Sequence, residues 1–268
     1  MSGQPRILGI YSLNRSTEVG VGGTAKEYVQ KTYWFARRLD DDAYEVQPLN
    51  ANHIPSGIRN ILSKKDFVTG YVPEPGYYEK KTLPHVQSLK KKLEMGEKHL
   101  REGCLDEAEK VFCKAILLDE NSCEANVGLG EVYCRTQDHK KLCEVLRRIL
   151  NLDEVFKEEQ RHLFNRFGID LRKAGYRPEA IAYYQRAIAF SPDDENLHFN
   201  IARVHFEAGD LGDCTEHLHT ALGINPHFAE AGDFLRYLES SSVVSGTDGP
   251  PSGKPHGKDP ARSTEGDI

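Results

Sequence analysis

The chain has 268 residues, of which 41 are acidic and 35 basic, and its formal net charge is −6 at pH 7. This acidic balance disfavours nucleic-acid binding through bulk charge, and no apolar run approaches the ~20 residues that a membrane-spanning helix needs. The six cysteines show no CxxC spacing and no secretory signal pattern is present, so we expect reduced thiols and a cytoplasmic protein.

The composition divides the chain into three predicted regions. Residues 1–84 hold much of the Gly and Pro and are expected to form a small β-rich module and a connector. Residues 85–239 are dense in Leu, Ala, Glu, Lys and Arg, which predicts helices. Residues 240–268 contain Ser, Gly, Pro and charge, with too little apolar surface to offset their ordering entropy, so we expect a disordered tail.

The first region contains the signals of a β-hairpin. Residues 31–39 include a Tyr-Trp-Phe cluster, residues 44–49 alternate in polarity, and the Asp-Asp-Asp-Ala run at 40–43 is a turn signal between them. Residues 7–13 predict a third strand, and Ser63 is a candidate N-cap of a helix. A module of this size is marginal alone, so we expect it to lean on the helical region that follows.

Three other features of the first region predict structure rather than chemistry. The glycine-rich run at 20–24 lacks the Gly-Lys-Ser/Thr of a phosphate-binding loop, so it predicts a flexible loop between two strands. Residues 71–78 contain two prolines and predict an extended connector. Trp34, the only tryptophan, is predicted to lie in the core.

The second region repeats a pattern of small residues. Two antiparallel helices approach closely only where small side chains meet, and a glycine lets the first helix end in the left-handed conformation. The last two turn glycines are 34 residues apart. The small positions, in chain order within each unit, are Gly96-Gly103-Ala108-Ala115, Gly168-Gly175-Ala180-Ala187 and Ala202-Gly209-Cys214-Ala221.

Two further features accompany this pattern. An aromatic residue stands at Phe112 and Tyr184, and a proline follows the second helix at Pro192 and Pro226. The whole pattern resembles the tetratricopeptide repeat. The resemblance implies a mainly α fold in which a helical solenoid follows the β-rich module. The predicted parts are four repeats at 89–122, 123–156, 161–194 and 195–228, and a capping helix at 229–239.

The second repeat departs from the pattern. Gln137 stands at the turn where the other repeats have glycine, and Leu142 stands where a small residue is expected, so this helix pair should be pushed apart. The four residues at 157–160 are an insertion before the third repeat. We expect them to interrupt the superhelix and to leave two half-solenoids with a joint between them.

The sequence offers little for catalysis or metal binding. It carries no nucleophile elbow, Walker motif or HExxH, so we expect no enzyme. His139 and Cys143 stand at i and i+4 with Cys134 nearby, but structural zinc sites need four ligands at short spacings, so we expect neither metal nor cofactor. Cys214 is predicted to be a small core residue, and Cys143 has no evident partner.

The repeat resemblance implies that the first helix of each unit lines a concave groove. In the third and fourth repeats this face combines amides, arginines and phenylalanines, which suit an extended, acidic peptide. An ordinary solvated helix face is the alternative interpretation. Gly128 is predicted to face the same groove and to tolerate alanine. The predicted peptide-binding residues are Asn165, Arg166, Arg172, Asn196, Phe199, Asn200, Arg203 and Phe206.

The leading functional prediction is a non-catalytic adaptor or scaffold that binds a protein partner. The alternative is a regulatory sensor whose first region binds a small ligand or nucleotide through Arg37, Arg38 and the glycine-rich run at 20–24, and whose repeats relay the state. We expect neither nucleic acid nor membrane as a partner. The sequence leaves the identity of the protein partner, the pathway and the oligomeric state open.

Overall fold

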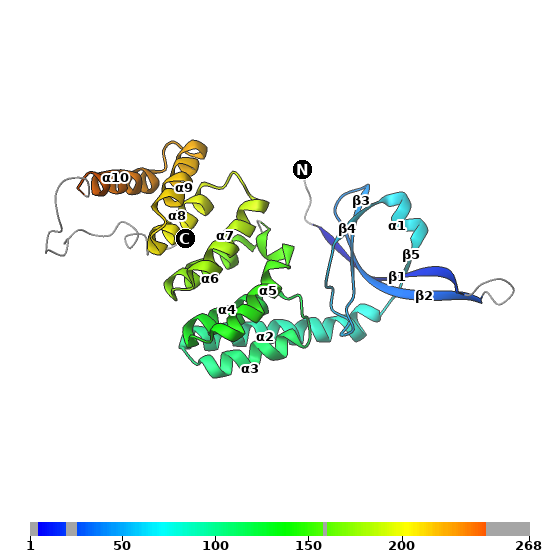
Figure 1. Ribbon diagram of the computed structural model, residues 1–268. Helices are drawn as coiled ribbons and strands as arrows, with labels where there is room; N and C mark the ends of the chain where they lie inside the picture. The colour runs from blue at the N-terminus through cyan, green and yellow to red at the C-terminus, as the bar shows by residue number, and fades with distance from the viewer. Residues whose placement is uncertain (1–4, 20–25, 158–159, 245–268) are drawn as a thin grey trace. The chain divides into compact units, whose positions relative to one another are not determined.

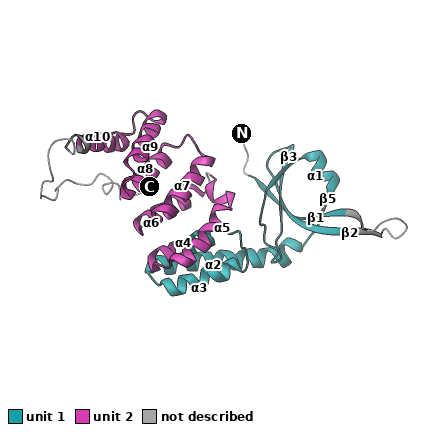
Figure 2. Cartoon of the chain, viewed as in Figure 1, with its two compact units in different colours: residues 1–129 teal, residues 130–268 magenta. Residues whose placement is uncertain are grey.

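The computed structural model describes residues 5–19, 26–157 and 160–244 (Figure 1). The predicted loop at 20–24 and the tail from 245 onward lie outside these residues. The chain divides into two compact units, Met1–Leu129 and Gly130–Ile268 (Figure 2). Their boundary falls inside the helix Cys123–Thr136, and the joint expected at 157–160 stays a prediction.

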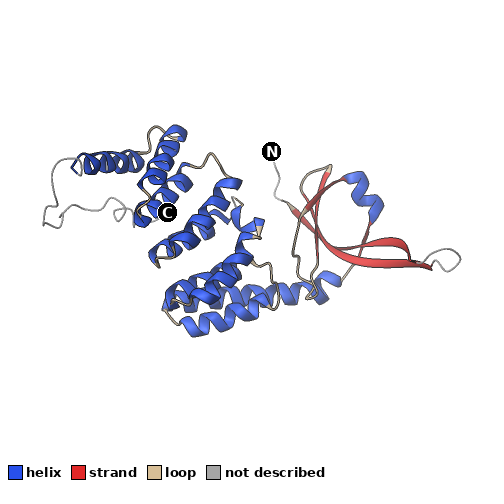
Figure 3. Cartoon of the chain, viewed as in Figure 1, coloured by secondary structure: helices blue, strands red, loops and turns tan. Residues whose placement is uncertain are grey.

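The first unit begins with a five-stranded antiparallel sheet in the order β4-β3-β2-β1-β5 (Figure 3). The predicted hairpin and third strand are confirmed, and two short strands complete the sheet. In β2 and β3 the register pairs Trp34 with Pro48 and Arg38 with Tyr44. The strands are β1 Arg6–Val19, β2 Lys26–Arg38, β3 Ala43–Pro48, β4 Asn60–Ser63 and β5 Tyr71–Pro73.

Local hydrogen bonds explain where these elements turn. Oδ1 of Asp40 accepts from the backbone N–H of Asp42 at 2.8 Å and of Ala43 at 2.7 Å, which closes the predicted β2–β3 turn. Ser63 is the N-cap of α1 Lys64–Gly70, and its hydroxyl accepts from the N–H of Asp66 at 3.1 Å. The three-residue β5 lies within the segment that the sequence predicted to be an extended connector.

The segment after β3 is hydrogen-bonded to the link between the first two helix pairs. Nδ2 of Asn50 donates to the carbonyl of Leu118 at 2.9 Å. The hydroxyl of Ser56 donates to Oδ1 of Asp119 at 2.7 Å. Burial raises the pKa of this carboxyl, and the hydrogen bond from Ser56 opposes the shift. The β-rich module therefore leans on the first repeat, as predicted.

The rest of the described chain is helical and forms the four predicted helix pairs and a final helix (Figures 1 and 3). The first helix of the first repeat begins before residue 89, where the repeat was predicted to start. The final helix continues past residue 239, its predicted end. The repeats are α2 Leu83–Glu102 with α3 Leu105–Ile116, α4 Cys123–Thr136 with α5 His139–Leu150, α6 Arg161–Lys173 with α7 Arg177–Phe190, and α8 Glu195–Ala208 with α9 Leu211–Ile224. The short π-helix η2 Tyr78–Thr82, the 3-10 helix η3 Asp153–Phe156 and the helix α10 Ala229–Val244 complete the set.

The turns inside the repeats follow the predicted glycines. Gly103, Gly175 and Gly209 have φ of +76°, +84° and +90°, which is the left-handed region. Gln137 takes the same conformation at φ +57°, although it carries a side chain. The turn pattern therefore continues through the second repeat. Within the described part of the chain, no helix is both long and apolar enough to cross a bilayer.

Small residues meet aromatic rings at the helix crossings, as predicted for Gly96 and Gly168. A Cβ added to Gly96 would lie 2.6 Å from the ring of Phe112, and one on Gly168 would lie 2.6 Å from the ring of Tyr184. Gly128 differs from its prediction. A Cβ there would lie 2.4 Å from the ring of Phe112, so this glycine packs against α3 and its assignment to an open groove is wrong.

Candidate functional site

The eight predicted peptide-binding residues lie on α6 and α8, the first helices of the third and fourth repeats. We call this set the α6–α8 face. The Arg172 guanidinium forms an ion pair with Glu207, and Arg161 forms one with Asp194, so each contact joins α6 to α8 or to its N-cap. These contacts place the two helices side by side and bring the predicted residues into one region.

Two arginines of the α6–α8 face, Arg166 and Arg172, form ion pairs with acidic residues of the protein. Nε of Arg166 lies 2.5 Å from Oε1 of Glu131, whose side chain is only 1% exposed. A carboxylate buried to this extent needs a charged or hydrogen-bonded partner, since desolvation disfavours its ionised form. Arg166 and Arg172 therefore hold successive repeats together, a role that the sequence did not predict for them.

Three residues of the face are buried rather than presented. Arg172, Phe199 and Arg203 are 9%, 7% and 5% exposed. The ring of Phe199 packs 5.0 Å from that of Phe228, and the Arg203 guanidinium lies 5.9 Å from the ring of Phe199. These buried side chains support the surface of the face but are not available to contact a ligand. Sequence spacing placed them on the correct helices but did not reveal their burial.

The other five residues reach the surface. Asn196 is exposed, while Asn165, Arg166, Asn200 and Phe206 are half-buried. Oδ1 of Asn165 is a buried acceptor without a hydrogen-bond partner among the described residues. An amide group supplies both N–H donors and a carbonyl acceptor, which matches the alternating groups of a peptide backbone. The chemistry of this surface is thus amide hydrogen bonding beside one partly exposed arginine.

Asp170 is a further titratable residue near this face that the sequence did not single out. It lies on α6, one turn after Arg166, and its Oδ2 is buried without a hydrogen-bond partner in the described structure. Burial raises the pKa of the Asp170 carboxyl, while Arg135, Arg166 and Lys173 oppose the shift. Together with Glu131, this carboxyl offsets the positive charge that the sequence assigned to the face.

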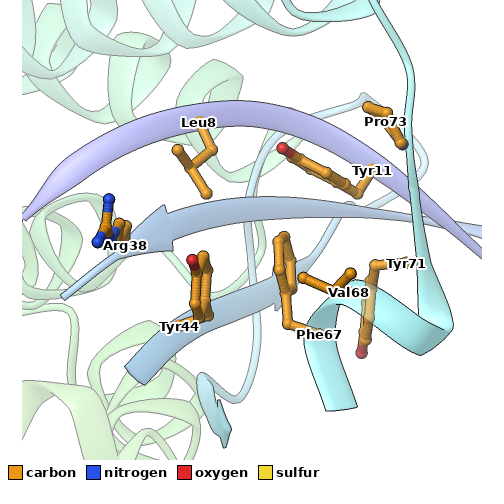
Figure 4. A pocket seen from close by; sticks show the side chains of 8 residues that line it. All are labelled: Leu8, Tyr11, Arg38, Tyr44, Phe67, Val68, Tyr71 and Pro73. Carbon is orange, nitrogen blue, oxygen red and sulfur yellow. The ribbon is translucent and has the colours of Figure 1, made fainter. Parts of the chain in front are cut away.

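A separate cavity of about 350 Å³ opens in the β-rich module (Figure 4). Part of its wall is an aromatic stack, in which the centroid of the Phe67 ring lies 4.5 Å from that of Tyr44 and 5.5 Å from that of Tyr71. Arg38 also lines the cavity, and it forms an ion pair with Asp41. The lining residues are Leu8, Tyr11, Arg38, Tyr44, Phe67, Val68, Tyr71 and Pro73.

The other residues assigned to ligand binding or packing have clear positions. Arg37, the second arginine of the predicted ligand site, does not line this cavity and forms an ion pair with Glu45 at 2.9 Å. Cys214 is fully buried, as predicted. Cys143 was predicted to lack a partner, and this prediction is wrong, because its thiol lies 3.4 Å from Nε2 of His139.

The comparisons with known proteins agree with the predicted repeat. Residues 170–209 match the family model described as the TPR repeat, the tetratricopeptide repeat. The match runs from within α6 to the turn after α8, so it includes both the Gly175 turn and most of the α6–α8 face. The predicted repeat family is confirmed on residues that carry the predicted spacing.

One curated relative and several solved structures are similar to parts of the chain. The peroxisomal targeting signal receptor of Eremothecium gossypii is 28% identical over 108 residues, which are 40% of this chain and 18% of the receptor. The chain thus spans less than a fifth of that relative's length. PilF of Pseudomonas aeruginosa has 18% identity and a TM-score of 0.45, covering 60% of this chain and 72% of PilF. MamA of Desulfovibrio magneticus RS-1 has 17% identity and a TM-score of 0.43, covering 58% of this chain and 86% of MamA.

Proposed function

We propose that this tetratricopeptide-repeat protein is an interaction module that binds an extended segment of a partner protein across the α6–α8 face. Repeats of this kind stack into solenoids that offer extended concave surfaces to their ligands. Binding without catalysis, in an adaptor or scaffold of the cytoplasm, is part of the same proposal.

The observation that carries the proposal is the set of side-chain amides on two neighbouring first helices. Asn165 on α6 and Asn196 and Asn200 on α8 all reach the surface to some extent, and the Arg172–Glu207 ion pair joins their helices. An extended peptide needs donors and acceptors at intervals along its backbone, and side-chain amides can supply both. The curated relative is named as a receptor for a targeting signal, which supports recognition of a protein segment.

The proposed preference for an acidic segment depends on Arg166. Its side chain is 41% exposed even with Glu131 bound. A guanidinium carries five N–H donors in a planar fork, so it can bind a second carboxylate beside the first. Phe206, half-buried on α8, adds an apolar contact. A short segment with one acidic and one apolar side chain would fit this set.

Selection of short random peptides on the full-length protein tests the proposal. We expect the enriched peptides to be acidic, because the exposed cation of the face is Arg166. The double variant Arg166→Gln with Asn200→Ala should weaken their binding at least about tenfold, since losing charged and neutral hydrogen bonds costs about 1–3 kcal/mol each. Because Arg166 also pairs with the buried Glu131, the double variant should melt at a lower temperature, so binding is measured well below that temperature, where far-UV circular dichroism shows the variant folded.

Glu144→Lys is the matched control, because Glu144 is exposed on α5 and does not belong to the face. Binding should survive this change. If the selected peptides bound the double variant as tightly as the unmodified protein, the α6–α8 face would not be the binding site.

The cavity in the β-rich module favours a second candidate function, a sensor of a small aromatic or nucleotide ligand. Tyr11, Tyr44 and Tyr71 line it with aromatic side chains, and Arg38 offers a cation beside them. A thermal-shift screen of nucleotides against the full chain tests this function. A ligand that raises the melting temperature of the unmodified protein, but not of Arg38→Ala, would support the sensor.

A further inference from the structure

His139, Cys143 and Glu179 bring three metal-ligand atoms close together in the second unit. His139 and Cys143 stand at i and i+4 on α5, and Glu179 lies in the first turn of α7. Nε2 of His139 lies 2.6 Å from Oε1 of Glu179 and 3.4 Å from Sγ of Cys143, and Sγ lies 3.9 Å from the same oxygen. A nitrogen, a sulfur and an oxygen donor therefore surround one small volume.

The arrangement differs from a nucleophilic cysteine triad. In a triad the acid holds one ring nitrogen of histidine and the nucleophile contacts the other. Here Glu179 and Cys143 both face Nε2 of His139. Burial, followed by the nearby Glu179 carboxylate, also raises the pKa of the Cys143 thiol, which disfavours the reactive thiolate. Convergence of an oxygen and a sulfur on one nitrogen is compatible with three ligands around a cation.

The separations are close to those of a tetrahedral zinc site. Zinc holds nitrogen and oxygen at about 2.0–2.1 Å and sulfur at about 2.3 Å, which places neighbouring ligand atoms roughly 3.3–3.6 Å apart. The 3.4 Å between Cys143 and His139 falls in this range. The two separations that involve Glu179 differ from it by less than about 1 Å, which side-chain rotation can supply.

The surroundings orient the cluster and leave one side open. The ring of Tyr176 stacks on that of His139 with centroids 5.3 Å apart and planes 14° apart. Asp138 caps α5 by accepting from the N–H of Lys141 at 3.1 Å, which fixes the helix turn that carries His139. The Glu179 side chain is 15% exposed, while that of His139 is 58% exposed. A bound ion would thus be held from the protein side and accessible from solvent.

Two other groups of potential ligands occur in the described residues, and both are looser. In the group His99, Glu102 and Cys104, the histidine lies 4.0 Å from a carboxylate that is half exposed. In the group at 205, 210 and 213, the buried histidine lies 3.7 Å from each of two exposed carboxylates. The cluster on α5 and α7 is distinguished by its shorter contacts.

We propose that His139, Cys143 and Glu179 form a zinc site with three protein ligands and a fourth coordination position open to water or to a group from a bound partner. Mixed nitrogen, sulfur and oxygen donors suit a borderline divalent ion such as zinc. The ion would replace the proton of the Cys143 thiol. Its two positive charges would then be balanced by the Cys143 thiolate and the Glu179 carboxylate. The site lies on α5 and α7 and does not depend on peptide binding at the α6–α8 face.

Titration of the metal-free full-length protein with Zn²⁺ against a coloured chelator tests the proposal, and Co²⁺ serves as a spectroscopic substitute. We expect tight binding of one equivalent, a thiolate-to-cobalt charge-transfer band, and tighter binding as the pH rises because the thiol must lose its proton. Cys143→Ser should remove the band. It should also weaken zinc binding at least about tenfold, since the loss of even an indirect supporting partner costs that much at metal sites.

Cys104→Ser is the matched control, because it removes a thiol from the looser group at 99, 102 and 104 and should keep both the affinity and the band. His139→Gln alters an exposed side chain, so it should fold normally and lose the zinc-dependent rise in melting temperature. The proposal is wrong if the unmodified protein binds no zinc. It is also wrong if Cys143→Ser and His139→Gln bind zinc as tightly as the unmodified chain.

Discussion

The third and fourth repeats close the same helix crossing with different pairs of side chains. In the third repeat, Gly168 lies against the ring of Tyr184. The residues 34 positions later are Ala202 and Leu218, and both are fully buried in one cluster. A large ring requires a glycine opposite, whereas a leucine leaves room for a methyl group. What the two repeats share is the volume that fills the crossing, because interiors are packed to constant density.

The largest expected effect comes from breaking the tighter of these crossings. Gly168→Leu should lower the free energy of unfolding by about 3 kcal/mol or more, because the added side chain must displace the buried ring of Tyr184. Ala202→Gly in the fourth repeat should cost only about 1 kcal/mol, the difference in helix propensity plus a small void. Urea denaturation measures both. Equal losses would show that the two crossings do not differ in tightness.

The crossing in the first unit sharpens the comparison, because there the ring of Phe112 faces two glycines. Gly128→Ala should destabilise by about 1–3 kcal/mol, since its methyl group would lie 2.4 Å from that ring. Gly212→Ala in α9 is the control, because nothing lies within 4 Å of its Cβ position. That change should be neutral or stabilise by up to about 1 kcal/mol. A neutral Gly128→Ala would restore the open-groove assignment.

The fourth repeat also differs from the third in carrying a histidine cluster. Nδ1 of His198 lies 3.1 Å from Nδ1 of His217, and burial, followed by His198 and His205, lowers the pKa of His217 below its ordinary value of 6.5. The unfolded chain therefore takes up a proton first as the pH falls through 6.5. The stability is complete above that pH and declines on acidification towards the folded pKa.

We expect this decline to be below about 1 kcal/mol, because partial exposure of His217 screens the effect. Unfolding at pH 7.5 and at pH 5.5 measures it. His217→Gln should flatten the profile, while His227→Gln, at an exposed position in the link before α10, should leave it as it is. A profile that stayed equally steep in His217→Gln would assign the pH dependence to other groups.

The smallest expected effect concerns the turns. Gln137 has a φ of +57° where the third repeat has Gly175 at +84°. Gln137→Gly should stabilise by about 0.5 kcal/mol, because relief of the left-handed conformation, about 1–2 kcal/mol, exceeds the entropic cost of glycine. Gly175→Gln should destabilise by about 1 kcal/mol for the same reason. Thermal unfolding of both variants gives the sign. Two shifts in the same direction would contradict this account.

The helical part of the fold could be predicted because its signals are local and periodic. Each turn glycine and each small crossing residue recurs at a fixed spacing, so even Gln137 could be placed at its turn. The sheet was predicted less completely. β4 has four residues and β5 has three, and such short strands carry no period-two pattern that could be recognised.

The candidate sites were harder to predict, because they depend on pairs of residues far apart in the sequence. Periodicity placed Arg172 and Arg203 on the correct helix face but could not show their burial. Glu207, the partner of Arg172, lies 35 residues away on another helix. Glu179 lies 40 residues from His139 and belongs to the next repeat, so the spacing rules for metal ligands could not include it. Tertiary contacts of this kind are set by the packing between repeats.

The contact of Phe112 with two helices has a consequence for how the protein responds to force. Its ring lies between Gly96 on α2 and Gly128 on α4. Asn50, in the segment after β3, donates to the carbonyl of Leu118 in the link between α3 and α4. A pull on the N-terminal sheet would load this link directly. Because one ring fills space beside both helices, α2 cannot be peeled away without exposing α4. The first repeat and the start of the second should therefore yield together, as one mechanical element.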